Sequence, residues 1–205
     1  MRSLTLAAAA AAFAAPALAE PITPVAIAPE TVAAAIAAAW PDLSPELQAR
    51  VDQDETMAAC TQYRDLPPDD IHEAILAREK ANIVYPADGV LMGDWQAGMK
   101  EANNGYGGRM RDNPDRVVGG NCYACHQLAP DEVAYGNLGP SLTGYGTLEP
   151  LTDERIKATY EKIFNAQSVL PCSQMPRMGA NGFLTPEQVR DFVAMLLHPD
   201  SPVNK

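Results

Sequence analysis

Two cysteines and a histidine are the most reactive residues that the sequence places together. Cys122 and Cys125 stand three positions apart in the stretch NCYACHQL, and His126 follows directly. Three kinds of chemistry use residues of this type and spacing: a redox-active dithiol, half of a zinc site, and covalent attachment of a haem. The rest of the chain has to decide between them.

The first two alternatives lack the surroundings that they require. A dithiol of the thioredoxin type belongs to a strand–helix–strand pattern, and the sequence shows no convincing strand. A structural zinc site needs four ligands, but the remaining histidines, His72 and His198, stand in no paired spacing. Neither a redox dithiol nor a zinc site is therefore predicted.

Covalent attachment of haem explains each position of the motif. Cys-x-x-Cys-His is the signature of c-type haem attachment. The two thiols add to the two vinyl groups of the haem, and the adjacent imidazole is then placed to bind the iron. We predict that Cys122 and Cys125 hold one haem c covalently and that His126 is an axial iron ligand.

Haem iron has a sixth position that is either filled by the protein or open. Methionine opposite histidine is typical of cytochromes c, where it raises the reduction potential, and a filled position leaves no room for a substrate. Met175 and Met178 lie in CSQMPRMG, a loop between two expected helices. We predict Met175 as the iron ligand, because Pro176 stiffens the loop directly after it, and Met178 as packing on the porphyrin. Cys172, in the same loop, is an alternative iron ligand in its thiolate form.

A ligating histidine needs a partner for its second ring nitrogen. Such an imidazole normally donates the other N–H to a carbonyl or a carboxylate, which fixes the orientation of the ring. The turn LGPSL at residues 138–142 follows the motif closely. We predict that the Pro140 carbonyl accepts this hydrogen bond; the alternative is that Pro140 serves only the turn.

The beginning of the chain predicts export. Residues 1–19 combine a basic residue, an apolar run and the pattern Ala17-Leu18-Ala19, which is typical of a cleaved signal peptide. A retained membrane anchor is the alternative, but the run is short for a bilayer span of about 20 residues. No later stretch is long and apolar enough to span a membrane, so we expect a periplasmic location.

The composition argues against two classes of partner, and the cysteine count predicts a disulfide. The chain has 26 acidic and 15 basic residues and a net charge of −11, which disfavours nucleic acid and anionic membrane surfaces as partners. The periplasm oxidises thiols, and two cysteines remain once the motif cysteines are assigned to haem. We therefore predict a disulfide between Cys60 and Cys172.

Helical patterns dominate the chain, so we expect a mainly α architecture. An N-terminal extension, residues 20–89, is rich in alanine and proline and lacks the apolar content for a strong core of its own. Thr185, Pro186 and Gln188 form the capping-box pattern that begins the last helix. The expected helices span residues 30–40, 44–60, 68–82, 94–104, 153–164 and 186–197.

Three segments, taken together, resemble a known family. In order, they are GNCYACHQL, GNLGPSLTGYG and CSQMPRMG, and they are similar to class I c-type cytochromes. The combination resembles more closely SoxX, the monohaem subunit family of the SoxAX sulfur-oxidising cytochromes. This resemblance covers residues 90–198, and the extension carries no specific motif.

For the fold, the resemblance implies a class I cytochrome c domain at residues 90–205. Its first and last helices, 94–104 and 186–197, would cross, and Gly98 would allow a close approach to Phe192. The resemblance also implies iron ligation by His126 and Met175.

For function, the resemblance implies a heterodimer with a SoxA-type cytochrome subunit that carries one or two haems. The partner would supply the catalytic cysteine, so no catalytic residue is expected on this chain. The pair would act as an L-cysteine S-thiosulfotransferase that joins thiosulfate oxidatively to a cysteine of the carrier protein SoxY. This chain would pass the electrons to a soluble cytochrome. Two alternatives remain: a free-standing periplasmic electron carrier, and a catalytic haem that uses Cys172.

Overall fold

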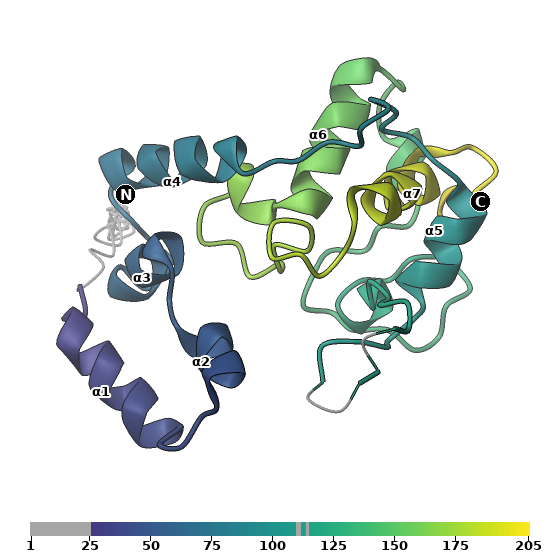
Figure 1. Ribbon diagram of the computed structural model, residues 1–205. Helices are drawn as coiled ribbons and strands as arrows, with labels where there is room; N and C mark the ends of the chain where they lie inside the picture. The colour runs from purple at the N-terminus through teal and green to yellow at the C-terminus, as the bar shows by residue number, and fades with distance from the viewer. Residues whose placement is uncertain (1–25, 110–111, 114) are drawn as a thin grey trace, which may run out of the picture.

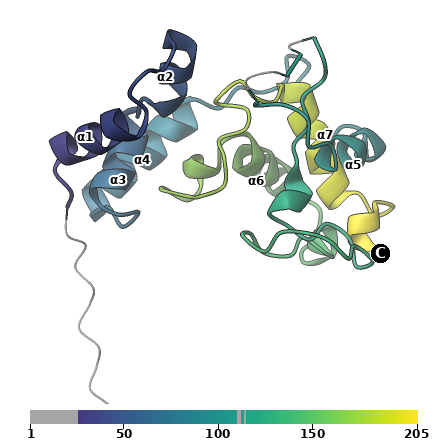
Figure 2. The same ribbon diagram turned by 90° about the horizontal axis from the view of Figure 1, so that it is seen from below.

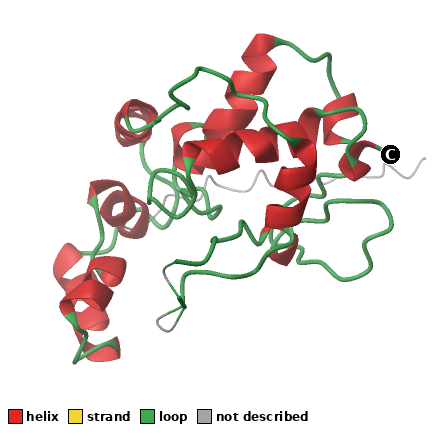
Figure 3. Cartoon of the chain, turned by 45° about the vertical axis from the view of Figure 1, so that its right-hand side comes forward, coloured by secondary structure: helices red, strands yellow, loops and turns green. Residues whose placement is uncertain are grey.

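The computed structural model describes residues 26–109, 112–113 and 115–205, and in these ranges every regular element is helical (Figures 1 and 3). The predicted signal peptide, residues 1–19, lies outside the described residues. The mainly α fold class is confirmed. The α-helices are α1 Pro29–Ala39, α2 Pro45–Val51, α3 Glu55–Gln62, α4 Asp69–Ala81, α5 Trp95–Ala102, α6 Asp153–Phe164 and α7 Pro186–Leu197. The short 3-10 helices are η1 Cys122–Ala124, η2 Tyr145–Thr147, η3 Ala166–Ser168 and η4 Pro202–Asn204.

The helices form two groups along the chain. Helices α1 to α4 lie on one side of the molecule and α5 to α7 on the other, and both views show this separation (Figures 1 and 2). The main hydrophobic core belongs to the second group, and Ile83, in the segment after α4, already packs against it. In the same segment Tyr85 stacks on Tyr160 of α6, with ring centroids 5.5 Å apart. The boundary at residues 89 and 90 stays a prediction.

The crossing of α5 and α7 organises the main core. Gly98 of α5 is buried against α7, where an added Cβ would lie 2.1 Å from the backbone oxygen of Asp191 and 3.0 Å from the Cβ of Met195. The crossing was expected, and the atoms of α7 nearest to Gly98 belong to Asp191 and Met195. Asp191 and Met195 stand four residues apart and so share one face of α7, whereas the Phe192 ring lies against Gly120, beside the cysteine motif.

Side-chain caps define the starts of α6 and α7 as the sequence predicts. The Thr152 hydroxyl accepts a hydrogen bond from the Arg155 N–H at the start of α6. At the start of α7, Thr185 and Gln188 form the complete capping box. Such caps satisfy backbone N–H groups that have no partner inside the helix.

The predicted helix over residues 44–60 is wrong, because two helices replace it. The backbone of Asp52 is extended after α2, and Asp54 then caps α3 by accepting a hydrogen bond from the Met57 N–H. Aspartate favours the N-cap over the helix interior, since its carboxylate competes for backbone N–H groups. A capping residue inside the helical pattern therefore starts a new helix.

The N-terminal helices have only a small core. Buried Cys60 and Ile75 pack with Cys172, which comes from the second half of the chain, and α1 has no buried residue. The extension therefore depends on the rest of the molecule for its burial, as its composition predicts. Within the described ranges, none of the helices has the length and apolar character needed to traverse a bilayer.

Candidate haem site

The cysteine motif forms one tight turn. Cys122 begins the 3-10 helix η1 after Asn121, which has a left-handed backbone with φ of 50°. The carbonyl of Cys122 accepts hydrogen bonds from the N–H groups of Cys125, at 3.1 Å, and His126, at 2.9 Å. This turn fixes the two thiols and the imidazole in one compact unit.

The two motif thiols are free and available for attachment. Neither Cys122 nor Cys125 is in a disulfide, and both are half-buried. Burial raises the pKa of the Cys122 thiol to about 12.

The turn after the motif orients the histidine. The Nδ1 atom of His126 lies 2.7 Å from the Pro140 carbonyl oxygen, and a carbonyl oxygen can only accept, so Nδ1 carries the proton. The lone pair of the ring is then on Nε2, the nitrogen left for a metal. The structure thus contains the Pro140 contact that the sequence predicts.

Close backbone packing fixes the face of the histidine ring. Gly139 lies so near His126 that an added Cβ would be 2.2 Å from the ring carbon Cε1. The Gly139 N–H also donates a hydrogen bond to the Cys125 carbonyl at 2.9 Å. Any larger residue at position 139 would displace the ring or the turn.

Both candidate methionines lie on the loop between η3 and α7. Met175 and Met178 are half-buried and pack against the main core. The Met178 carbonyl accepts hydrogen bonds from the N–H groups of Phe183 and Leu184, both at 3.0 Å, which ties it to the chain that enters α7. The assignment of Met175 as the iron ligand stays a prediction.

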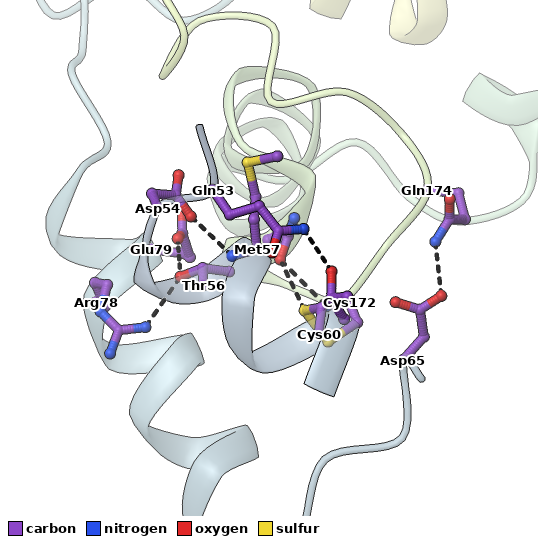
Figure 4. Close-up of a disulfide and its surroundings, with 12 residues drawn as sticks. Gln53, Asp54, Thr56, Met57, Cys60, Asp65, Arg78, Glu79, Cys172 and Gln174 are labelled. Carbon is purple, nitrogen blue, oxygen red and sulfur yellow. Dashed lines mark hydrogen bonds between the residues drawn. A yellow bond between two sulfur atoms is a disulfide. The ribbon is translucent and has the colours of Figure 1, made fainter. Parts of the chain in front are cut away.

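The disulfide removes Cys172 from the candidate ligands. Cys60 and Cys172 are joined, with their Cα atoms 5.3 Å apart and 112 positions of sequence between them (Figure 4). A sulfur atom in a disulfide offers no thiolate to iron. The pairing is the one that the sequence predicts, and it argues against a catalytic haem that uses Cys172.

Comparison with known proteins gives the family of this site. Residues 115–198, which include the motif, the Pro140 turn and the methionine loop, match the cytochrome c family. The chain therefore contains a cytochrome c domain. This cytochrome is also 42% identical over 162 residues to an uncharacterized lipoprotein of Aquifex aeolicus (strain VF5), a match that covers 75% of this chain and 73% of the relative. Residues 90–205 make up less than three quarters of the chain, so the matched region also includes part of the extension.

The cytochrome c domain implies that the protein carries covalent haem c and acts in haem-based electron transfer. The described residues fit this group: two free thiols stand one turn apart, and the oriented imidazole beside them has an unprotonated Nε2. Haem c supplies an iron that gains and loses one electron. Cys122 and Cys125 would hold the group, and His126 would bind its iron through Nε2.

One cluster beside the methionine loop was missed by the sequence analysis. The Arg177 guanidinium binds the Asp54 carboxylate at 2.5 Å and the Glu79 carboxylate at 3.2 Å. Glu79 is only 1% exposed, and it also accepts hydrogen bonds from Thr56 at 2.5 Å and Asn165 at 2.7 Å. The cluster joins residues more than 80 positions apart, so no local pattern reveals it. The one feature of the sequence that points to this cluster is Arg177, which stands two residues after the candidate ligand Met175.

Proposed function

We propose that this cytochrome is the monohaem electron-transfer subunit of a SoxAX-type heterodimer. Its partner would be a SoxA-type cytochrome with one or two haems and the catalytic cysteine. The pair would join thiosulfate oxidatively to a cysteine of SoxY, as an L-cysteine S-thiosulfotransferase. Electrons would leave through this chain to a soluble cytochrome.

The observation that carries the proposal is the combination of three segments in one domain. The motif at 121–128, the turn at 138–142 and the loop at 172–179 resemble SoxX in their residues and in their order. In the structure the second segment binds the histidine of the first, and the third packs its methionines on the same core. Cysteine–histidine attachment alone is common to cytochromes c, so the added segments are what favour SoxX.

In this proposal the residues of the chain bind and tune a redox centre. Cys122 and Cys125 would hold the porphyrin, and the Pro140 carbonyl orients His126, whose Nε2 would bind the iron. Met175 would supply the second protein ligand to the iron, and methionine ligation raises the reduction potential and excludes other ligands. A closed iron site agrees with electron transfer and places bond formation on the partner subunit.

A periplasmic location completes the proposal. The Ala-x-Ala pattern at the end of residues 1–19 supports export, and the Aquifex relative is described as a lipoprotein. The Cys60–Cys172 disulfide agrees with an oxidising compartment. SoxY would meet this chain through the heterodimer.

Isolation of the native protein tests the assembly. We expect a second haem-containing subunit to co-purify with this cytochrome, and we expect the pair to be reduced by thiosulfate when SoxY is added. The matched control is a pair whose SoxA-type subunit lacks its catalytic cysteine, which should not be reduced. If the cytochrome is isolated alone and only exchanges electrons with redox proteins, the free-standing periplasmic carrier replaces this proposal.

A further inference from the structure

The loop that carries Met175 is tied to the N-terminal helices on both sides of the methionine. Cys172, three residues before it, is bonded to Cys60 of α3. The Gln174 side chain donates a hydrogen bond to Asp65 at 2.9 Å (Figure 4). Arg177, two residues after Met175, binds Asp54 and Glu79.

The polar side chains of this loop bind residues from one part of the molecule, the N-terminal helices. Among the described residues, the side-chain hydrogen bonds and ion pairs of 172–177 that leave the loop end on residues 54–79. These residues belong to α3, to α4 and to the turn between them. The N-terminal helices therefore restrain the segment that bears the candidate ligand.

The ion pair between Arg177 and Glu79 is buried. The side chains of Glu79 and Arg177 are 1% and 10% exposed, so their charges have little water to solvate them. A buried charge requires a partner of opposite sign and hydrogen bonds for its remaining atoms. Thr56 and Asn165 supply those bonds to Glu79, so movement of Arg177 would leave a buried carboxylate uncompensated.

We propose that α3 and α4 clamp the methionine loop, and that Arg177 is the positioning residue through which Glu79 and Asp54 hold the Met175 thioether at the iron. The proposal deepens the proposed function, since it rests on Met175 being the iron ligand. It gives residues 54–79 a role in an electron-transfer site to which they contribute no ligand. A small electron carrier without this extension would have to hold its methionine loop from within its own domain.

The clamp makes a specific prediction about competition for the sixth position of the iron. An added ligand such as imidazole binds ferric iron only when Met175 has left, so its apparent dissociation constant is the intrinsic constant divided by the fraction of open sites. A weaker clamp raises that fraction. Imidazole should then bind more tightly to a protein whose clamp is broken.

The experiment is an optical titration of the full-length ferric holoprotein with imidazole. We expect Arg177→Gln to lower the apparent dissociation constant tenfold or more, and Arg177→Lys to recover part of the difference. The matched control is Arg190→Gln. Arg190 lies on α7, and its ion pair with Asp88, at 2.6 Å, is exposed and includes no residue of the methionine loop. The control should remain within twofold of the wild type.

A second variant covers the case in which Arg177→Gln fails to hold haem. Glu79→Gln keeps the shape of the side chain and its contact with Asn165 but removes the charge that binds Arg177, and it should also tighten imidazole binding. Apparent constants within twofold of the wild type for both Arg177→Gln and Glu79→Gln would overturn the clamp. If Arg177→Gln does not bind haem, the imidazole titration of Glu79→Gln alone tests the clamp.

The variant Met175→Ala shows whether a negative result means that there is no clamp or that Met175 is not the iron ligand. If this variant loses the methionine–iron charge-transfer band and binds imidazole with the affinity of an open site, Met175 is the ligand and the arginine variants test the clamp alone. If it keeps the band, the ligand assignment fails, and the clamp on Met175 fails with it.

Discussion

At the scale of single residues, His126 is oriented by two contacts from one short turn. The Pro140 carbonyl accepts a hydrogen bond from its Nδ1 at 2.7 Å, and Gly139 packs against its ring. The histidine and its cysteines could be predicted from the sequence because the motif is contiguous and the chemistry requires each position. Pro140 could also be predicted, since the turn follows the motif closely. The partners of Arg177 could not, because they stand 98 and 123 positions away in the chain.

Replacement of the two loop methionines tests the sixth ligand. We expect Met175→Ala to abolish the near-infrared methionine–iron charge-transfer band of the ferric protein and to lower its reduction potential, because methionine ligation favours reduced iron. The matched control is Met178→Ala, which should retain the band. The opposite pattern in the near-infrared spectra would assign the iron to Met178.

Asp54 links the stability of the clamp to pH. Burial alone would raise its pKa, but the Met57 N–H and the Arg177 guanidinium outweigh this effect and hold the pKa of the carboxyl below its ordinary value of 3.8. A lowered folded-state pKa stabilises the protein above the unfolded-state pKa, and this contribution disappears as the pH falls through the folded value.

We therefore expect Asp54→Asn to reduce the free energy of unfolding at pH 6 by about 1 kcal/mol or less, the range for a partly exposed ion pair. Asparagine can still cap α3, so the variant isolates the charge. Urea unfolding at pH 6 and at pH 3 measures the effect, and the difference from the wild type should shrink at the lower pH. A difference that grows on acidification would contradict this reading of Asp54.

At the scale of elements, the helix caps determine which helix boundaries could be predicted from the sequence. The start of α7 was predicted because Thr185 and Gln188 act within four residues of each other. The break between α2 and α3 was missed because Asp54 stands inside a continuous helical pattern. The crossing of α5 and α7 was implied by the resemblance to class I cytochromes c, and Gly98 lies at it, but the residues of α7 nearest to Gly98 depend on the rotation of α7 about its axis.

Gly98→Ala tests this crossing. Alanine favours a helix over glycine by about 1 kcal/mol, but its Cβ would lie 2.1 Å from the backbone oxygen of Asp191. The backbone cannot yield as a side chain can, so we expect a net loss of about 1–3 kcal/mol in the free energy of unfolding. The control is Gln96→Ala at an exposed position of α5, which should change that free energy by less than about 0.5 kcal/mol. A stabilised Gly98→Ala protein would show that the helices can move apart.

At the scale of the whole molecule, several long-range contacts join the N-terminal helices to the haem-binding half, and two of them involve buried side chains of the methionine loop. One is the ion cluster around Arg177, and the other is the disulfide between Cys60 and Cys172. The disulfide could be predicted by accounting for all four cysteines in an oxidising compartment, whereas the ion cluster has no such constraint. Both contacts end on the methionine loop, so the fold links its smaller core to the segment that carries Met175.

Chemical counting of thiols tests the assignment of all four cysteines at once. Cys122 and Cys125 should be thioethers to haem, and Cys60 and Cys172 should be a disulfide, so the denatured holoprotein should show no free thiol. After reduction it should show two. A thiol that titrates before reduction would contradict the disulfide, and four thiols after reduction would contradict covalent haem.

Removal of the disulfide should also weaken the molecule as a whole. A cross-link that closes a loop of this length restricts the unfolded chain, and its loss costs about 2–5 kcal/mol in the free energy of unfolding. We expect Cys60→Ala combined with Cys172→Ala to show such a loss in urea unfolding, followed by circular dichroism. The reduced wild type is the control, and it should lose stability by a similar amount because it lacks the same cross-link. If the double variant unfolds at the same urea concentration as the oxidised wild type, the disulfide does not contribute to holding the two halves together.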